Sequence, residues 1–321
     1  MPDLSIIIVN WNSAIYLNTC IRTILESTRG LNYEIIVVDN ASYDGSEAVA
    51  RQHGDSVRFV QSDENLGFGR ANNLGYHRSR GNALLFLNPD TEILADALGK
   101  MYETLLSNEY IGALGCRVLN TDGSIQTSCI QAFPTIINQL LDAECIRNRF
   151  PKSMLWGMGP LYEASDRPLE VEAIAGSCLM VRRDIFEKAG LFSEEYFMFA
   201  EDLDLCYKMR KHGYRNYYYG GASVVHHGGG STKSTGKGSF SAVLMRESVK
   251  KFLQKFHGET YSILYVLTMQ LVAVTRILML LIIYPVSLLG LVKMGTLDMA
   301  LNKWGSILFW SIGMESWARK S

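Results

Sequence analysis

The sequence predicts an α/β fold built on a parallel β-sheet, and three observations indicate it. Short runs of aliphatic and β-branched residues alternate with amphipathic stretches over the first 90 residues. A polar cluster follows each of these runs. At 321 residues, 48% of them hydrophobic, the chain can also bury one large core. Strands that alternate with helices favour parallel pairing through crossover helices.

Four strands and their helices are expected in this front part. We predict strands at residues 4–9, 34–38, 57–60 and 83–87. A helix follows the first strand after Asn12 and Ser13, which are good N-cap residues, and further helices begin near 44–46 and 69–71. Beyond them we predict an apolar strand at 173–181, a helix at 201–212, a short strand at 222–225 and a mobile glycine-rich loop at 228–238.

The polar clusters at the ends of the first four strands predict a ligand site. They occupy residues 10–12, 39–42, 61–65 and 88–90. Ligands of open parallel sheets bind at the carboxyl ends of the strands, although Asn, Asp and Ser are also common in simple turns. Four clusters at one edge favour the ligand site. In the acidic turn (residues 88–92), Asp90 offers the carboxylate oxygen that phosphate-carrying cations prefer.

Other features narrow the class of protein. Gly67-Phe68-Gly69 lacks the third glycine of a dinucleotide fingerprint, and the loop at 228–238 lacks the spacing of a phosphate loop, so neither motif is predicted. The six cysteines form no Cys-x-x-Cys pair, which favours a reducing, cytosolic location without a zinc site or disulfide framework. The amino terminus does not resemble a secretory signal, so export is not expected. No nucleic-acid partner is expected.

A second group of candidate residues lies around the later strand and helix. Gly176 interrupts the apolar strand, where it either permits close approach of a ligand or marks a bulge. Helical spacing predicts that Asp204 forms a solvated ion pair with Lys208 while Asp202 faces inward. Desolvation would raise the basicity of Asp202 and the helix amino end would oppose it, which suits a general base. Glu201 is expected to cap the helix.

The histidines at the end of the strand at 222–225 are a weaker signal. A single histidine in such a place is more often a hydrogen-bonded structural residue than a metal ligand. His226 is a candidate metal ligand only if it acts together with Asp90.

Taken in order, five motifs carry a resemblance to a known family. They are VNWN at 9–12, VVDNAS at 37–42, NLGFGRANN at 65–73, LNPD at 87–90 and AEDLDLC at 200–206. Over roughly its first three quarters the chain resembles the inverting family 2 glycosyltransferases of the GT-A fold, within the rhamnosyltransferase-like branch. The resemblance implies a nucleotide-sugar-binding GT-A domain at residues 1–240. Residues 241–321 are expected to form a separate helical, membrane-associated region because of their own composition.

The resemblance also implies roles for particular residues. Asp39 would contact the pyrimidine base of the donor, with Asn10, Asn65 and Arg70 nearby and Gly176 also in the donor site.

Asp90 would hold a divalent metal, Mg²⁺ or Mn²⁺, on the donor diphosphate, with His226 as a second ligand. Asn88 stands where many members of the family have another acid, a form familiar in this branch. Asp202 would take the proton from the acceptor hydroxyl, and the configuration at the anomeric carbon would invert.

The implied reaction is transfer of L-rhamnose from dTDP-rhamnose to a polyprenyl-diphosphate-linked glycan in bacterial cell-envelope polysaccharide synthesis. The base-binding motif does not separate thymine from uracil, so UDP-galactose, UDP-galactofuranose and UDP-N-acetylglucosamine stay open as donors. Two other classes of protein stay open as alternatives. A nucleotidyltransferase would release pyrophosphate, and a noncatalytic nucleotide-binding subunit would turn nothing over.

The carboxyl-terminal region is apolar and basic. Residues 241–321 hold nine Lys and Arg against four Asp and Glu, whereas the preceding residues hold 22 against 28. Only Arg276 divides the apolar runs 263–275 and 277–292, which together could span a bilayer once, lie in its interface or form a buried hairpin. The lysines and a helical stripe near the end favour attachment to the cytoplasmic face of the membrane. These residues are Lys250, Lys251, Lys255, Ile307, Trp310, Met314 and Trp317.

Overall fold

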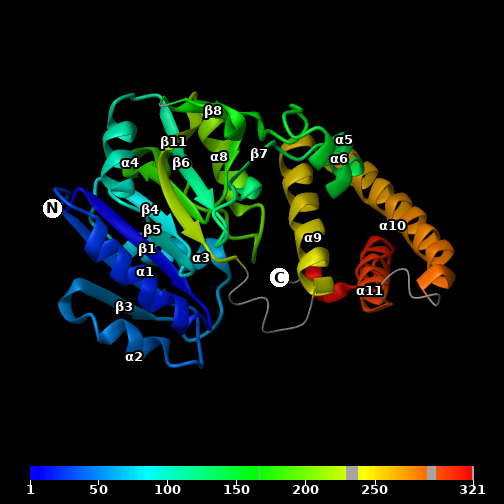
Figure 1. Cartoon of the computed structure of the whole chain (residues 1–321), viewed down its shortest axis with the longest axis horizontal. Coiled ribbons are helices and arrows are strands. Elements are labelled where there is room, and N and C mark those ends of the chain that lie inside the picture. The colour runs from blue at the N-terminus through cyan, green and yellow to red at the C-terminus, as the bar shows by residue number, and fades with distance from the viewer. Residues whose placement is uncertain (166, 229–237, 288–293, 320–321) are drawn as a thin grey trace. The chain divides into compact units, whose positions relative to one another are not determined.

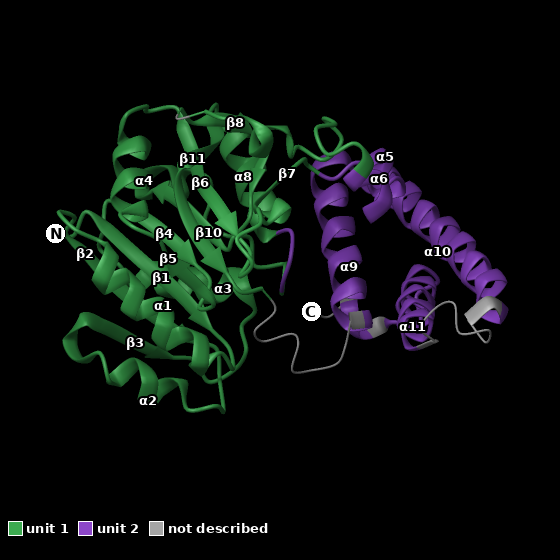
Figure 2. Ribbon diagram, in the orientation of Figure 1, with its two compact units in different colours: residues 1–133, 149–197, 201–234 green, residues 134–148, 198–200, 235–321 purple. Residues whose placement is uncertain are grey.

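A computed structural model describes residues 1–165, 167–228, 238–287 and 294–319, and it divides the chain into two compact units (Figure 2). The first unit comprises Met1–Phe133, Arg149–Phe197 and Glu201–Ser234. The second comprises Pro134–Asn148, Met198–Ala200 and Thr235–Ser321. Nearly all of the glycine-rich stretch at 228–238, for which a mobile loop was predicted, lies outside the described residues.

The first unit is built on a mixed sheet with the strand order β3-β2-β1-β4-β10-β6-β11-β5, to which β8 adds by pairing with β11 (Figure 1). The strands are β1 (Leu4–Asn10), β2 (Tyr33–Asp39), β3 (Val57–Gln61), β4 (Ala83–Leu87), β5 (Thr91–Ile93), β6 (Ile111–Leu119), β8 (Leu169–Val171), β10 (Cys178–Arg182) and β11 (Arg215–His226). A separate pair joins β7 (Ile130–Gln131) to β9 (Ala173–Ile174). The predicted α/β class and the parallel pairing of the first four strands are confirmed.

Helices cover both faces of this sheet. They are α1 (Ala14–Ser27), α2 (Ser46–Arg51), α3 (Phe68–Arg78), α4 (Ala97–Leu106), α7 (Arg183–Lys188) and α8 (Glu201–Lys211), with short 3-10 helices η1 (Gly54–Ser56), η2 (Thr127–Cys129) and η3 (Gly159–Tyr162). The connections through α1 and α3 run in opposite directions along the sheet, so right-handed crossovers put these helices on opposite faces. Helix α1 begins after Ser13 as predicted, but its first N–H, that of Ala14, donates to Asp44 Oδ2 at 2.8 Å.

The strand directions bring several polar ends to one edge of the sheet. Strand β1 lies between β2 and β4, and here the chain switches from building one side of the sheet to building the other. Because β10 is antiparallel to both β4 and β6, and β11 is parallel to β6, the carboxyl end of β11 lies at the same edge as those of β1, β2 and β4. Ligands bind at such a switch point in open α/β sheets.

The apolar stretch at 173–181 differs from the prediction because it forms two short strands. β9 ends at Ile174 and β10 begins at Cys178. In the break, the N–H of Ala175 donates to the carbonyl of Cys129, and the carbonyl of Ser177 accepts from the N–H of Asn88. These bonds take the chain out of the regular ladder around Gly176.

The second unit is helical. It contains α5 (Ile136–Leu140), most of α6 (Glu144–Arg149), α9 (Gly238–His257), α10 (Glu259–Ser287), α11 (Met294–Ser311) and the 3-10 helix η5 (Ser316–Arg319). Residues 259–285 of α10 form one helix that is long and apolar enough to cross a membrane, with a mean hydropathy of 2.3. Arg276, which divides the two apolar runs of the sequence, lies inside this helix.

Helix α10 has two different faces. Tyr265, Met269 and Ala273, spaced four residues apart, are buried in the helical unit. The opposite side exposes large apolar side chains along most of the helix: Ile263, Leu264, Leu267, Leu271, Val274, Leu278, Leu281 and Ile282. Water disfavours an apolar face of this length on an isolated soluble protein.

The predicted helical stripe near the carboxyl terminus is wrong. α11 ends at Ser311, before Met314 and Trp317. Ile307 and Trp310 are buried within the helical unit, and the indole N–H of Trp310 donates to Glu247 Oε2 at 2.7 Å. These two side chains therefore pack the unit and do not face a membrane.

Candidate functional site

The ends of β1 and β2 hold Asn10 and Asp39 against each other. Asn10 Nδ2 donates to Asp39 Oδ1 at 2.9 Å, and Asp39 Oδ2 accepts from the N–H of Ser42 at 2.8 Å and from Gln61 Nε2 at 3.0 Å. Both side chains are buried. Among the described residues, Asn10 Oδ1 has no hydrogen-bond partner. A buried acceptor of this kind is costly unless a ligand or water donates to it.

Two strained residues shape the loops beside this pair. Asn12 and Ala41 have positive φ angles of 50° and 60°. The N–H of Asn12 donates to Ser42 Oγ, and Asn12 Oδ1 accepts from the N–H of Tyr43, so the two loops are tied together. Positive φ is uncommon outside glycine and is often found at functional sites.

The loop before α3 is held by side-chain amides. Asn65 Oδ1 accepts from Asn40 Nδ2 at 2.9 Å and from the N–H of Gly67 at 3.0 Å. Gly67 has a φ of +78°, and a Cβ there would lie 2.1 Å from the carbonyl oxygen of Phe197. Only glycine fits, and it fixes the start of α3, whose first turn carries the exposed Arg70.

The acidic turn brings Asp90 to His226. The chain returns from this turn as β5, which pairs antiparallel with β11 so that His226 lies opposite Thr91. Asp90 Oδ1 is 3.1 Å from His226 Nε2, and Asn88 Nδ2 is also 3.1 Å from that nitrogen. Asp90 is only 7% exposed. The two residues expected to act together therefore touch.

Gln126 is a site residue that the sequence did not indicate. Its Oε1 lies 2.7 Å from His226 Nδ1, while its Nε2 donates to Asn120 Oδ1 at 3.1 Å. The second bond fixes the amide orientation, so Gln126 accepts the Nδ1 proton and leaves the Nε2 lone pair toward Asp90 in the neutral ring. A signal was available, because Asp122-Gly123 is a hairpin dipeptide that returns the chain to this edge.

The adjacent His227 turns elsewhere. Its Nε2 contacts Glu92 Oε1 at 2.6 Å, and its ring packs 5.1 Å from the ring of Tyr16. The backbone N–H of His227 donates to the carbonyl of Asp90, which helps to hold the acidic turn.

The contact between Asp90 and His226 fits a divalent cation. Two ligands about 2.1 Å from an octahedral ion and at right angles lie about 3 Å apart. The observed separation of 3.1 Å between Oδ1 and Nε2 suits such a pair. Among the described residues, no His, Cys, Asp or Glu completes a set of three ligands. An ion held here would therefore keep positions for phosphate oxygens and water.

Asp202 lies at the start of α8, where two backbone groups hold its carboxylate. The N–H of Gly176 donates to Oδ2 at 2.9 Å, and the N–H of Leu203 donates to Oδ1 at 2.8 Å. Burial raises the pKa of Asp202 above its usual value, and these two donors partly oppose the shift. Each oxygen keeps a second lone pair that can accept a proton.

The two neighbouring acids differ from their predictions. Asp204 does pair with Lys208, at 3.1 Å, but it is fully buried and also accepts from Ser193 Oγ at 2.6 Å, so the pair is not solvated. Glu201 is 5% exposed, and burial followed by the charge of Asp202 raises its pKa well above the usual value. It is packed inside, where its carboxylate also accepts from its own backbone N–H at the start of α8.

One short connection links Asp202 to the acidic turn. Gly176 donates to Asp202, and the next residue, Ser177, accepts from the N–H of Asn88 at 3.1 Å. A Cβ on Gly176 would lie 2.9 Å from the ring of Phe68, so a side chain would crowd the connection. Asp202 and the Asp90–His226 pair are thus anchored to consecutive residues at one edge of the sheet.

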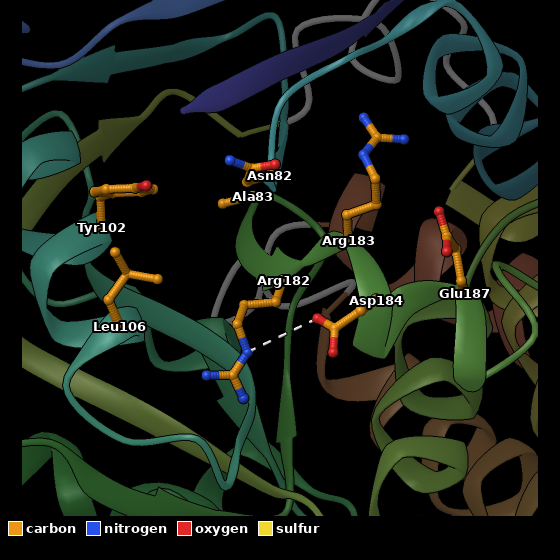
Figure 3. A pocket seen from close by; sticks show the side chains of 8 residues that line it. All are labelled: Asn82, Ala83, Tyr102, Leu106, Arg182, Arg183, Asp184 and Glu187. Carbon is orange, nitrogen blue, oxygen red and sulfur yellow. Dashed lines mark ion pairs between the residues drawn. The ribbon is translucent and has the colours of Figure 1, made fainter. Parts of the chain in front are cut away.

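A hollow of about 300 Å³ at the other end of β4 has a different character (Figure 3). It is lined by Asn82, Ala83, Tyr102, Leu106, Arg182, Arg183, Asp184 and Glu187. Arg182 Nε is 4.0 Å from Asp184, and its Nη1 donates to the carbonyl of Asn108. Arg183 Nε donates to the carbonyl of Gly81 at 2.6 Å. These arginines hold loops together.

Known proteins resemble this chain over the region that contains the site. The low-salt glycan biosynthesis hexosyltransferase Agl10 of Haloferax volcanii is 28% identical over 216 residues, which cover 66% of this chain and 62% of the relative. The N-acetylglucosaminyl-diphospho-decaprenol L-rhamnosyltransferase of Mycobacterium tuberculosis is 32% identical over 199 residues, covering 57% and 63%. The matched region therefore spans a little over three fifths of each of these relatives.

The fold and family agree with these relatives. The mannosyltransferase PcManGT of Pyrobaculum calidifontis, solved with GDP-Man and Mn²⁺, superposes with a TM-score of 0.56 at 16% identity, covering 98% of this chain and 87% of that one. This likeness confirms a GT-A-like sheet and concerns the fold alone. The family model for glycosyl transferase family 2 matches residues 5–190. That match includes more than half of the chain, and the chain therefore belongs to glycosyl transferase family 2.

Proposed function

We propose that this glycosyltransferase moves L-rhamnose from dTDP-rhamnose, with inversion, onto a glycan carried by a polyprenyl diphosphate. The transfer would take place at the cytoplasmic face of a bacterial membrane during cell-envelope polysaccharide synthesis. The name of the mycobacterial relative, a rhamnosyltransferase acting on a decaprenol-linked sugar, supports this choice of donor and acceptor. The exposed apolar face of α10 supports the membrane location.

In this proposal the nucleoside binds at the ends of β1 and β2. Asp39 contacts the base, and the buried Asn10 Oδ1 accepts a hydrogen bond from the donor. Asn65 shapes the adjoining loop, and Arg70 offers a cation to the phosphates. Gly176 leaves the backbone open to the sugar.

Asp90 and His226 would hold Mg²⁺ or Mn²⁺ beside the diphosphate, as the family fold implies. When bound, the ion offsets the charge that grows on the departing nucleoside diphosphate. Gln126 orients His226 by accepting the Nδ1 proton, so that Nε2 can act as a ligand. Asn88 in place of a second acid leaves Asp90 as the anionic ligand of the turn.

Asp202 is the proposed base. The acceptor hydroxyl attacks the anomeric carbon from the face opposite the diphosphate, its proton passes to a free lone pair of Asp202, and the bond from the anomeric carbon to the diphosphate oxygen breaks. The raised pKa of Asp202 makes it a stronger base than an ordinary aspartate. The observation that carries the proposal is the link from Asp202 through Gly176 and Ser177 to the acidic turn.

The donor can be identified by a screen of nucleotide sugars with a membrane extract that contains lipid-linked acceptors. The liberated nucleoside diphosphate is measured. Release of dTDP from dTDP-rhamnose alone is the expected result. Release of UDP from a galactose, galactofuranose or N-acetylglucosamine donor would replace the sugar assignment, and release of pyrophosphate would replace the reaction class.

The role of Asp202 is tested by Asp202→Asn, which keeps the size of the side chain and removes the base. We expect turnover to fall by about 10²- to 10⁴-fold, because a general base contributes roughly that factor. Donor affinity, measured by calorimetry, should change little. Asp55→Asn, at an exposed position outside the polar clusters, is the matched control. Parent-like turnover in Asp202→Asn would remove it from the mechanism.

A further inference from the structure

The helical unit gathers cationic side chains from four of its helices. Arg147 of α6 and Arg246 of α9 share one carboxylate, with Nη1 of Arg147 at 3.1 Å from Asp142 Oδ1 and Nη2 of Arg246 at 3.8 Å from Oδ2. Arg276 of α10 and Lys303 of α11 share one indole, at 5.8 Å and 5.7 Å from the centre of the Trp304 ring. The helices concerned are coloured as one unit in Figure 2.

The two pairs belong to one cluster. Burial lowers the pKa of Lys303, and so do the positive charges of Arg246, Arg147 and Arg276, whereas Asp142 raises it. Charges influence each other in this way only over short distances. We call these four cations the cationic cluster. Its one shared carboxylate leaves an excess of positive charge, which a bound anion would relieve.

Glu247 follows Arg246 on α9, and among the described residues its ion pair is with Lys250, which is outside the cluster. Its carboxylate accepts from the indole of Trp310 at 2.7 Å and lies 3.5 Å from Lys250. It is buried among these partners.

Buried donors at the cluster also lack regular hydrogen bonds. Arg246 is 7% exposed, and its Nη1 donates to Gln139 Oε1 at 2.9 Å. The fully buried Tyr265 hydroxyl lies against the Arg246 guanidinium, and among the described residues neither it nor Arg246 Nε has a hydrogen bond of regular geometry. A buried donor without a good hydrogen bond is unfavourable. A ligand with several acceptor oxygens could satisfy both groups, and guanidinium groups suit phosphate oxygens.

The cluster sits on the packed side of the helix that exposes the apolar face. Arg276 lies three residues after Ala273 and continues the inward stripe through Tyr265 and Met269. Leu267, Leu271 and Leu278 point to the other side and are more than half exposed. One helix therefore combines a cationic site with a surface for hydrocarbon, and a lipid that bears a phosphate group matches both.

We infer that the cationic cluster binds the diphosphate group of the lipid that carries the acceptor glycan. This inference rests on the proposed function, in which that lipid is a polyprenyl diphosphate. A diphosphate bonded at both ends carries two negative charges at neutral pH and presents oxygens on two phosphorus atoms. A phospholipid diester without further ionised groups carries one. The excess of cations over Asp142 favours the diphosphate.

The test measures binding of farnesyl diphosphate to the full-length protein in detergent micelles by calorimetry. Arg276→Gln and Lys303→Gln each remove one cation from a partly exposed position, and each should weaken binding about tenfold, as expected for a lost bond to a charged group. The double variant should weaken it further. Lys100→Gln, at an exposed position of α4 in the first unit, should stay within twofold of the parent. Thermal unfolding of each variant checks that the helical unit is folded.

Three comparison ligands separate the sources of the phosphate. Farnesyl monophosphate and inorganic pyrophosphate should bind more weakly than farnesyl diphosphate. Equal affinity for pyrophosphate would identify a site for soluble anions, and equal competition by dioleoylphosphatidylglycerol would identify a phospholipid site. Either result overturns the inference, as would unchanged affinity in the folded double variant.

The same samples separate this inference from the proposed function. Binding of dTDP to the first unit should be unaffected by Arg276→Gln and Lys303→Gln. A parent protein that binds farnesyl diphosphate through the cluster but transfers no sugar contradicts the proposed function alone. A protein that transfers sugar while both variants keep full affinity for farnesyl diphosphate contradicts the inference alone.

Discussion

The ring of His226 depends on an amide that no sequence motif marks. Gln126 accepts from Nδ1, and Nε2 then faces Asp90. Gln126→Leu removes the acceptor at similar size, and we expect it to weaken Mn²⁺ binding about 10- to 100-fold, the usual range for partners of metal ligands. The measurement is a calorimetric titration with Mn²⁺ in the presence of dTDP.

Gln126→Glu keeps an acceptor toward Nδ1 and should restore most of the affinity. In the metal-free protein, the ¹⁵N shifts of His226 should report a proton on Nδ1 in the parent and a mixed population in Gln126→Leu. Gln52→Leu, at an exposed position, is the control for an unrelated glutamine. The orienting role is refuted if leucine and glutamate at position 126 bind Mn²⁺ equally well.

Glu201 makes stability depend on pH. Its pKa is raised in the folded chain, so the folded state takes up a proton more readily than the unfolded state, whose pKa is near the ordinary 4.5. This contribution to stability is fully present below the ordinary pKa and is lost as pH rises through the folded pKa. Glu201→Gln cannot ionise and therefore avoids this loss of unfolding free energy, which is about 1.4 kcal/mol for each unit between the folded and unfolded pKa values. Its melting temperature should therefore gain on that of the parent as pH rises from about 4 to 8.

Thermal unfolding at several pH values measures this difference. Glu26→Gln, which changes an exposed glutamate of α1, should show no such trend. A constant difference between Glu201→Gln and the parent across the pH range would contradict the assigned shift.

The amino-acid pattern identified the acids of α8 but not their environments. Helical spacing correctly paired Asp204 with Lys208. It could not show that Ser193 and Tyr196, from the preceding loop, would cover Asp204 completely. It also could not show that Glu201 would be packed inside. Burial depends on segments distant from the helix, which local periodicity does not contain.

At the scale of elements, the start of α3 depends on Gly67. An alanine there would meet both a φ of +78° and the Phe197 carbonyl oxygen at 2.1 Å. Gly123, with a φ of +81° and open space around it, isolates the first effect. Gly123→Ala should cost about 1–2 kcal/mol, and Gly67→Ala at least about 2 kcal/mol more, because backbone must move. Chemical denaturation of both variants measures the difference, and equal costs would show that the loop yields without strain.

The central strands could be predicted because they are continuous apolar runs that are buried on both faces. β4 has the predicted bounds, and β1 and β2 differ by one residue at their ends. The break between β9 and β10 could not be predicted, because it is set by hydrogen bonds to Cys129 and Asn88, which lie far away in the chain. The sequence likewise contains no pattern that indicates that β10 runs antiparallel within an otherwise largely parallel sheet.

At the scale of the whole molecule, the exposed face of α10 should decide where the protein resides. Leu271→Glu with Leu278→Glu places two charges on this face, where both side chains are more than half exposed. Each charge at the centre of a bilayer costs about 2.5–3.5 kcal/mol on insertion scales. We expect the double variant to lose flotation with liposomes while the parent floats.

Leu106→Glu, at an exposed leucine of α4 in the first unit, should float like the parent. Thermal unfolding of the double variant should show an intact first unit. The membrane attachment is refuted if the folded double variant and the parent float equally, or if the parent does not associate with liposomes at all.

No sequence pattern indicated which helix would contact Arg276. The sequence indicated that a charge inside an apolar run needs protein or headgroups near it. The structure adds Trp304 of α11 as the partner, at 5.8 Å. Contacts between separate helices depend on their packing, and a single arginine in a hydropathy pattern cannot specify them.

The connection at residues 175–177 has a consequence for how such enzymes diversify. Its backbone holds Asp202 on one residue and Asn88 on the next, so it sets the spacing between the proposed base and the proposed metal site. Substitutions in the loops after β1, β2 and β3 could exchange one donor for another without altering this spacing. An inserted residue at 176 would lengthen it, and we expect such insertions to be rejected in descendants that keep the same stereochemistry.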